Sequence, residues 1–270
     1  MHKPTQPIEY LEELIPVLVD PVEHAPVEVR RYQEQVVGLI STKGDVYEVR
    51  NNIPMMVPNM NRSGIPPKLV KAWTALQDKE LEDYAKTSIG VFSVDGNEIA
   101  IRMAKMMKNA GMRGRCLDIG CGVLPTPAYM SGQDDVRFIG VDPFLGNNDR
   151  DFPFVQAIGE FLPFKDHVFD GAMFASTIDH HMDPRQALRE ALRVLKREGR
   201  LYIWYTNKKM SMAYLRWKMS AKPKQFDAHH QWAFTDKSMR VMVEECGFKA
   251  NGSLPLGDGT SKLLIASVSG

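Results

Sequence analysis

Two short stretches of the sequence place an acidic side chain beside residues that let a backbone approach a ligand. The run LDIGCG at 117–122 carries Asp118, Gly120 and Gly122 at the end of a short apolar stretch. Glycine permits the sharp turn that brings a backbone close to a bound molecule. A dinucleotide-binding loop would have a third glycine to seat a pyrophosphate, but Leu124 follows here. The run therefore favours a ligand with an amino-acid end, while a plain tight turn after a strand is the alternative.

A second acidic residue ends the next apolar run. The stretch FIGVD closes with Asp142, about 20 residues further along the chain. A carboxylate at the tip of a second strand can accept hydrogen bonds from both hydroxyl groups of a ribose. Asp142 alone could equally be a solvated loop acid, but the two stretches together are far more specific than either one.

Four of the seven histidines could remove a proton from a substrate, and they form two adjacent pairs: His180 with His181, and His229 with His230. Histidine has an ordinary pKa of about 6.5, which suits a general base acting on an alcohol. The first pair lies between Asp179 and Asp183, whose carboxylates could orient or charge an imidazole. The alternatives are that one histidine of the first pair packs under a ligand or caps a helix, and that one of the second pins a loop to Trp232. We favour the first pair as catalytic candidates, with Asp179 as their partner.

The elements that must position these residues alternate between strand and helix after about residue 95. Five apolar runs predict strands: 116–119, 138–141, 154–157, 171–176 and 201–206. Three helices are predicted from capping signals: from an Asp95–Glu98 capping box to Gly111, from Asp183 to Gly199, and from Thr235 to Gly247. Two last runs around the turn 257–259 predict an antiparallel hairpin. This order predicts an α/β fold with a doubly wound, mostly parallel, Rossmann-like sheet, which binds ligands at the carboxyl ends of its strands.

The remaining parts of the chain predict a domain order. Residues 1–65 are Pro-rich and predict a small irregular accessory domain, with one hairpin that turns at 43–45. Residues 66–94 predict a helical linker or cap, and residues 95–270 the main domain. An insertion at about 206–234 is rich in basic, aromatic and methionine residues, which predicts an amphipathic lid helix. The functional alternative is a lid that supplies positive charge to an anionic substrate.

The composition excludes several classes of protein. The 270 residues are 44% hydrophobic and 25% charged, as in globular proteins, and the formal net charge of +1 argues against a nucleic-acid partner. No apolar run is long enough to span a membrane, and the acidic, Pro-broken start does not resemble a signal peptide. The three cysteines, Cys116, Cys121 and Cys246, show no metal-ligand spacing. We therefore expect a reduced, cytoplasmic protein with no disulfide framework and no metal site.

Successive stretches of the main domain resemble the motifs of one enzyme family in order and in spacing. They are CLDIGCG, FIGVDPF, GEFLPFKDHVFDGAMFASTIDHHMDP, ALREALRVLKREGRLYIW and HHQWAFTDKSMRVMVEECGF. The family is that of class I S-adenosylmethionine-dependent methyltransferases, in particular the ubiquinone/menaquinone-biosynthesis group and the bacterial glycan and natural-product O-methyltransferases. The resemblance covers about residues 95–268. It implies a Rossmann-like fold, S-adenosyl-L-methionine (SAM) as the cofactor, and transfer of a methyl group.

The resemblance also implies roles for individual residues. Eight positions match cofactor-binding positions of the family: Asp118, Gly120, Gly122, Asp142, Pro143, Phe144, Glu160 and Phe161. Asp118 and Gly120 would hold the amino-acid moiety, and Asp142 would hold the ribose hydroxyls. Pro143, Phe144, Glu160 and Phe161 would lie around the adenine. Two positions depart from the family pattern. Leu124 stands where many relatives have Gly, and Ile158 where many have an Asp that accepts a hydrogen bond from the adenine amino group.

From these features we expect methyl transfer to an oxygen of a small-molecule acceptor, such as a sugar or natural product. The basic insertion allows the acceptor to be anionic and suggests an RNA or protein methyltransferase as one alternative. The departures at Leu124 and Ile158 suggest another, a non-catalytic cofactor-binding protein with the same fold. No contact with a membrane is expected, and a homo-oligomer is left open.

Overall fold

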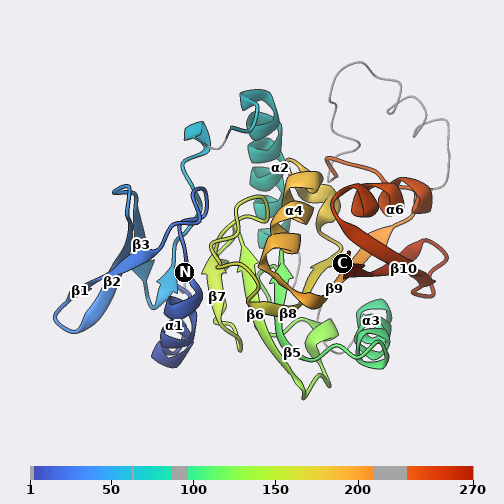
Figure 1. The fold of residues 1–270 in the computed structure, drawn as a ribbon, viewed down its shortest axis with the longest axis horizontal. Coiled ribbons are helices and arrows are strands. Elements are labelled where there is room, and N and C mark those ends of the chain that lie inside the picture. Colours follow the sequence, from blue (N-terminus) through green and yellow to red (C-terminus); the bar gives the residue numbers. More distant parts are fainter. Residues whose placement is uncertain (1–2, 63, 87–96, 209–229, 270) are drawn as a thin grey trace.

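The central element of the protein is a seven-stranded sheet. The computed structural model describes residues 3–62, 64–86, 97–208 and 230–269. The sheet has the strand order β10-β11-β9-β8-β5-β6-β7 (Figure 1). Its strands are β5 (Gly114–Ile119), β6 (Val136–Asp142), β7 (Phe154–Gln156), β8 (Phe169–Ala175), β9 (Leu195–Thr206), β10 (Phe248–Pro255) and β11 (Ser261–Val268). Strands β7, β6, β5, β8 and β9 are parallel, whereas β11 pairs antiparallel with β9 and β10. The predicted α/β class and the antiparallel hairpin at the end are confirmed.

Helices cover both faces of this sheet. Successive residues of a strand point to opposite sides, so neighbouring residues of one strand pack against different helices. The helix α3 (Glu98–Asn109) joins a hydrophobic cluster with Cys116 of β5. The helices α4 (Pro184–Val194) and α6 (Asp236–Glu245) join a second cluster with Leu117, the next residue of the same strand. Short 3₁₀ turns at Ala128–Met130 and Ile178–His180 follow β5 and β8. The core thus holds β5 rigidly between two helical layers.

The helix α4 begins as predicted but ends earlier than predicted. The Asp183 carboxylate caps its first turn by accepting backbone N–H hydrogen bonds. The helix stops at Val194, whereas the sequence predicted a helix up to Gly199. Leu195 is extended and pairs with Phe169 of β8. The sequence places Leu188, Ala191, Leu192 and Leu195 at helical spacing. At Leu195, sheet pairing overrides this spacing.

The predicted N-cap is wrong for helix α3 and correct for helix α6. The N-cap of α3 is Asn97, whose side chain accepts a hydrogen bond from the Ala100 N–H at 3.0 Å. The predicted cap at Asp95 is therefore wrong. The predicted cap of α6 is confirmed, since Thr235 and Ser238 form a reciprocal capping box.

The N-terminal part, predicted to be largely irregular, contains regular structure. It holds the helix α1 (Ile8–Leu14), a 3₁₀ turn at Ile15–Val17, and the antiparallel strands β1 (Val27–Tyr32), β2 (Gln35–Ser41), β3 (Val46–Arg50) and β4 (Ile53–Pro54). The hairpin predicted at 43–45 is confirmed, because β2 pairs with β3 on either side of Gly44. A 3₁₀ turn at Met60–Arg62 follows, and then the helix α2 (Pro67–Lys86), which lies within the segment 66–94 that was predicted to be helical.

This small sheet docks beside β7 at one edge of the large sheet (Figure 1). The Met56 N–H donates a hydrogen bond to the Gln156 carbonyl at 2.7 Å, and the Val19 N–H donates to the Pro163 carbonyl at 3.0 Å. Met56 belongs to the same hydrophobic cluster as Phe164. One core therefore spans parts of the predicted first and last domains, and the domain boundaries themselves stay a prediction. Most of the insertion at 206–234 lies outside the described residues.

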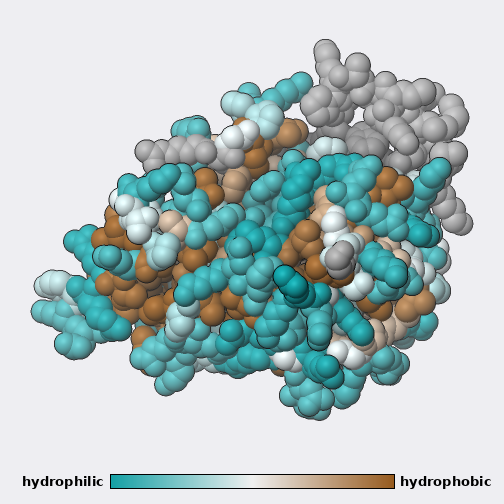
Figure 2. All heavy atoms as spheres, in the orientation of Figure 1, coloured by the Kyte–Doolittle hydropathy of each residue, from teal (hydrophilic) through white to brown (hydrophobic). Residues whose placement is uncertain are grey.

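Hydrophobic side chains gather on the visible face of the molecule over the region of β3, α1 and β7 (Figure 2). Tyr32, Val37 and Val46 of the small sheet are among the exposed hydrophobic residues. No helix within the described residues is both long and apolar enough to cross a membrane.

Candidate functional site

Asp118 near the end of β5 is fully buried, and within the described part of the chain only one of its oxygens accepts a hydrogen bond. The Tyr129 hydroxyl donates a hydrogen bond to Oδ2 at 2.8 Å. The other oxygen, Oδ1, has no hydrogen-bond partner among the described residues. Burial raises the pKa of Asp118 to about 7, because a charged carboxylate is poorly solvated there. An unpaired buried acceptor of this kind suits a hydrogen-bond donor that comes from a ligand.

The two glycines after Asp118 play different parts. Both have left-handed backbone angles, with φ of +85° at Gly120 and +69° at Gly122. A Cβ atom on Gly120 would lie 2.8 Å from side-chain atoms of Thr177, so only glycine fits there. A Cβ atom on Gly122 would meet no described atom within 4 Å. Gly120 therefore permits the close crossing of β5 and the segment after β8, whereas Gly122 borders free space.

Asp142 at the end of β6 ties two loops together. Its Oδ2 accepts a hydrogen bond from the Gly122 N–H and its Oδ1 from the Phe144 N–H, both at 2.8 Å. Burial raises the pKa of Asp142, and these backbone bonds act in the opposite direction. Each carboxylate oxygen keeps a further lone pair for a ligand hydroxyl group. The predicted neighbours, Pro143 and Phe144, are half-buried in the same loop.

Arg150 supports this loop and was missed by sequence reasoning. Its buried guanidinium donates hydrogen bonds to the carbonyls of Gly122, Phe144 and Leu145 at 2.6, 3.0 and 2.9 Å. It also lies 3.7 Å from the centre of the Phe154 ring. An arginine in a polar loop resembles any solvated charge in the sequence, so no local signal marks it.

The predicted adenine-side residues Glu160 and Phe161 are buried in the loop after β7. Glu160 Oε1 accepts a hydrogen bond from the Asp183 N–H at 3.2 Å, which fastens the loop to the start of α4. Phe161 packs with Ile158 and Met182 in a small hydrophobic cluster. These contacts hold the loop in place, and a direct role with adenine stays a prediction.

The residues at the tips of β5 and β6 fit the cofactor that the resemblance implies. Among the described residues, Asp118 Oδ1 is an unpaired acceptor for an amino group, and a Cβ atom on Gly122 would meet no atom within 4 Å. Asp142, 2.8 Å from the Gly122 N–H, has acceptor capacity left for hydroxyl groups. These acceptors fit the amino group and the ribose hydroxyl groups of SAM.

The two predicted histidines after β8 point to different surroundings. His181 is buried, its Nδ1 lies 2.9 Å from the Thr177 carbonyl, and its ring meets Phe174 edge-on with centroids 5.3 Å apart. A carbonyl only accepts, so Nδ1 carries the proton and donates it. A Cβ atom on Gly159 would collide with the other nitrogen. The contacts of His181 are those of a packed side chain, which is one of the alternatives stated above.

His180 instead joins Asp179 and His230 in what we call the Asp179 cluster. The Nε2 atom of His180 lies 3.8 Å from Asp179 Oδ1, and Nε2 of His230 lies 3.9 Å from Asp179 Oδ2. The two rings are 5.2 Å apart. The backbone N–H groups of Gln231 and Trp232 donate to the Asp179 carbonyl at 3.0 and 3.1 Å, which brings the distant His230 to this place. His229 lies outside the described residues.

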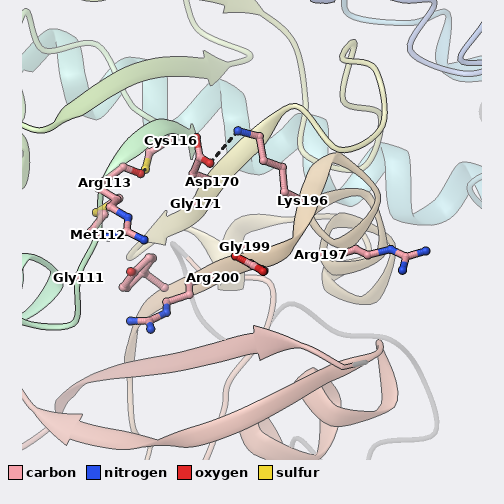
Figure 3. Close-up of a pocket in the computed structure, with 12 residues that line it drawn as sticks. Gly111, Met112, Arg113, Cys116, Asp170, Gly171, Lys196, Arg197, Gly199 and Arg200 are labelled. Atoms are coloured by element: carbon pink, nitrogen blue, oxygen red, sulfur yellow. Dashed lines mark hydrogen bonds and ion pairs between the residues drawn. The ribbon is translucent and has the colours of Figure 1, made fainter.

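A cavity of about 550 Å³ lies at the opposite end of the sheet (Figure 3). It is lined by residues at the starts of β5, β8 and β9, among them Cys116, Gly171 and Tyr202. Lys196 forms an ion pair with Asp170 at 2.7 Å across it. None of the predicted site residues lines this cavity.

Comparison with known proteins agrees with the fold and indicates an enzyme family. Residues 117–203 match a family model described as a methyltransferase domain. The uncharacterized protein MJ1123 of Methanocaldococcus jannaschii is 29% identical over 179 residues, which are 64% of this chain and 80% of that protein. The ubiquinone/menaquinone biosynthesis C-methyltransferase UbiE of Hahella chejuensis is 43% identical over 74 residues, which are 26% of this chain and 30% of UbiE.

A solved structure shares the fold over most of the chain. The 1,6-didemethyltoxoflavin-N1-methyltransferase of Burkholderia thailandensis, solved with S-adenosylhomocysteine, aligns with a TM-score of 0.57 over 90% of this chain and 100% of that one, at 16% identity. The matched family model begins at Leu117, beside the buried Asp118, and ends within β9. The chain therefore carries a class I S-adenosylmethionine-dependent methyltransferase domain, whose cofactor is SAM.

Proposed function

We propose that the chain transfers a methyl group from SAM to an oxygen atom of a small-molecule acceptor, such as a sugar or natural product. The observation that carries the acceptor side is the Asp179 cluster, which follows the carboxyl end of β8. Imidazole nitrogens and a carboxylate accept hydrogen bonds from a hydroxyl group. The Thr177 hydroxyl donates to the Ile119 carbonyl at 2.8 Å, so the segment that carries the cluster starts against the glycine turn.

On the cofactor side, SAM supplies an activated methyl group on a positively charged sulfur. Asp118 would accept a hydrogen bond from its amino group through the unpaired Oδ1. Asp142 would accept the ribose hydroxyls while it keeps the Gly122 N–H in place. Gly122 would leave room for the cofactor, while Gly120 allows the turn to lie close against Thr177. Pro143, Phe144, Glu160 and Phe161 would surround the adenine, as the resemblance implies.

We infer the acceptor atom and the acceptor class from the chemistry of the site rather than from similarity to known proteins. UbiE is described as a C-methyltransferase and the Burkholderia enzyme as an N1-methyltransferase, so relatives with this fold use different atoms. The collection of hydrogen-bond acceptors in the Asp179 cluster favours a hydroxyl group. The formal net charge of +1 favours a small molecule over RNA. A cytoplasmic location and a homo-oligomer stay predictions.

The proposal is tested with the purified chain and labelled SAM against a panel of hydroxylated sugars and phenols. We expect S-adenosylhomocysteine to accumulate with an acceptor, and nuclear magnetic resonance to place the new methyl on oxygen. The double variant His180→Ala/His230→Ala should lose methyl transfer while it still binds S-adenosylhomocysteine in calorimetry. His24→Gln is a matched control, because His24 is also half-exposed and lies 3.4 Å from an acid, Glu190.

Other outcomes would overturn parts of the proposal. A methyl group found on carbon or nitrogen would refute the oxygen acceptor. Steeply salt-dependent methylation of RNA would refute the small-molecule class. Tight cofactor binding with no transfer to any acceptor would favour the non-catalytic alternative.

A further inference from the structure

The side chains of the Asp179 cluster are those that bind metal ions, and they come from two distant parts of the chain. We propose that Asp179, His180 and His230 form a binding site for one divalent transition-metal ion. This inference rests on the proposed function and deepens it, because the ion would lie on the acceptor side of the methyltransferase site. The sequence predicted no metal site, since that expectation rested on the scattered cysteines.

The geometry of the cluster is close to that of a coordination sphere. Each residue offers one ligand atom, and these atoms all lie within 4.8 Å of one another. The shortest separations, 3.8 and 3.9 Å, join the two imidazoles to different oxygens of Asp179. Bonds of about 2.0–2.2 Å from a metal to N or O place neighbouring ligand atoms about 3–4 Å apart. A small inward movement of the half-exposed imidazoles would therefore complete three bonds to one ion.

The buried carboxylate gives an independent reason to expect a cation. Asp179 is 6% exposed, and its Oδ1 has no hydrogen-bond partner in residues 3–62, 64–86, 97–208 and 230–269. A buried carboxylate oxygen without a donor is unfavourable, and a metal ion would satisfy it. Gln231, next to His230, has a second buried acceptor, Oε1, that lacks a partner in the described part of the chain. In the same described residues, the ion pairs of Asp179 are formed with the two imidazoles and with no Lys or Arg.

The backbone around the cluster is held in place before any ion binds. The N–H groups of Gln231 and Trp232 both donate to the Asp179 carbonyl, at 3.0 and 3.1 Å. The Trp232 indole N–H donates to the His181 carbonyl at 2.7 Å. These three hydrogen bonds therefore fix the segment that carries His230 against the turn that carries His180. A ligand set held in this way loses little conformational entropy when it binds an ion.

Two imidazoles and one carboxylate suit ions such as Zn²⁺, Mn²⁺, Fe²⁺ and Co²⁺. Three protein ligands leave coordination positions for another molecule, and His180 and His230 are partly open to solvent. A cation held there would stabilise negative charge that develops on an acceptor oxygen. The competing explanation is that the same three side chains bind only hydroxyl groups of the acceptor.

The test uses the 270-residue chain without an affinity tag, freed of metal with a chelator and dialysed. Zn²⁺ and Co²⁺ are titrated by calorimetry, and bound Co²⁺ is followed by its visible absorption. We expect one equivalent per chain. The variants His180→Ala, His230→Ala and Asp179→Asn should each weaken binding about tenfold or more. His24→Gln should bind like the wild type, and circular dichroism with S-adenosylhomocysteine binding shows that each variant is folded.

The results separate this inference from the proposed function. No saturable uptake by the wild type, or equal uptake by the wild type and the His180→Ala/His230→Ala double variant, would overturn the metal site. Methyl transfer that continues at full rate in the presence of a chelator would overturn it as well, and would leave the proposed function intact. One equivalent of metal held by the cluster, without methyl transfer to any acceptor, would support the site and refute the proposed function.

Discussion

Replacing Asp118 by asparagine should stabilise the cofactor-free protein at neutral and higher pH and weaken cofactor binding at the same time. Burial raises the pKa of this carboxyl to about 7 from an ordinary value of 3.8. The negative charge of Asp142 also raises the pKa of Asp118, whereas the hydrogen bond that the Tyr129 hydroxyl donates favours the ionised form. Asparagine keeps an acceptor for that hydroxyl and removes the buried charge.

The sign and size of the effect follow from proton linkage. Below about pH 4, Asp118 is protonated in both the folded and the unfolded chain. Between pH 4 and 7, it is protonated only in the folded chain, so unfolding releases a proton and the free energy of unfolding falls as pH rises. A difference of about three pH units, at about 1.4 kcal/mol each, sets an upper limit of about 4 kcal/mol above pH 7.

Urea denaturation of wild type and Asp118→Asn between pH 4 and 8 measures this effect. The gap in free energy of unfolding should widen from pH 4 to 7 and then stay constant, with the variant more stable. Asp134→Asn is the control, because the Asp134 side chain is 90% exposed. In calorimetry, Asp118→Asn should bind S-adenosylhomocysteine about 10–100-fold more weakly, as expected for a lost hydrogen bond to a charged group. A gap that does not change with pH, or a variant less stable at pH 8, would refute the reasoning.

Four further substitutions probe the same loops. Asp142→Ala should weaken S-adenosylhomocysteine binding about 10–100-fold in calorimetry, because the ribose acceptor is lost together with the carboxylate that holds the Gly122 N–H. Gly120→Ala should lower the free energy of unfolding in urea by more than about 1–3 kcal/mol, since it combines a φ of +85° with a Cβ contact of 2.8 Å to Thr177. Gly122→Ala has the same backbone strain but no crowding, so it should destabilise the protein less than Gly120→Ala and chiefly weaken cofactor binding. Equal destabilisation by the two variants would contradict the packing argument. Arg150→Met should lower the free energy of unfolding by about 2–4 kcal/mol, because three carbonyl groups lose their donor; an unchanged urea midpoint would show that water replaces the guanidinium.

The positions of Asp118 and Asp142 at neighbouring strand ends could be predicted because their signals are local. Asp118 and Asp142 each stand near the end of an apolar run, and parallel pairing of β5 with β6 brings the two strand ends together. The glycine turn needs left-handed backbone angles, which glycine adopts readily. At these positions the local residue types agree with the fold, so the order of strands was enough to predict where the residues lie.

The arrangement of the Asp179 cluster could not be predicted in detail because it depends on tertiary contacts. His180 and His181 are adjacent, yet the 3₁₀ turn at Ile178–His180 directs one ring toward Asp179 and packs the other against Phe174. The approach of His230 depends on backbone hydrogen bonds to the Asp179 carbonyl, which leave no mark in the sequence. The helical spacing of Leu195 failed for a similar reason, since pairing with β8 outweighs local preference.

The docking of the N-terminal sheet beside β7 has a consequence for the solubility of the chain. A strand at the edge of a sheet exposes N–H and C=O groups that can pair with another molecule and start aggregation. In this protein the Met56 N–H occupies the Gln156 carbonyl, and Leu18 forms a bridge with Phe164 of the loop after β7. The N-terminal segment therefore protects an otherwise vulnerable edge and holds the loop that contains Glu160. Removing residues 1–65 would strip hydrophobic side chains from a shared core, so the accessory segment and the catalytic sheet should unfold as one cooperative unit.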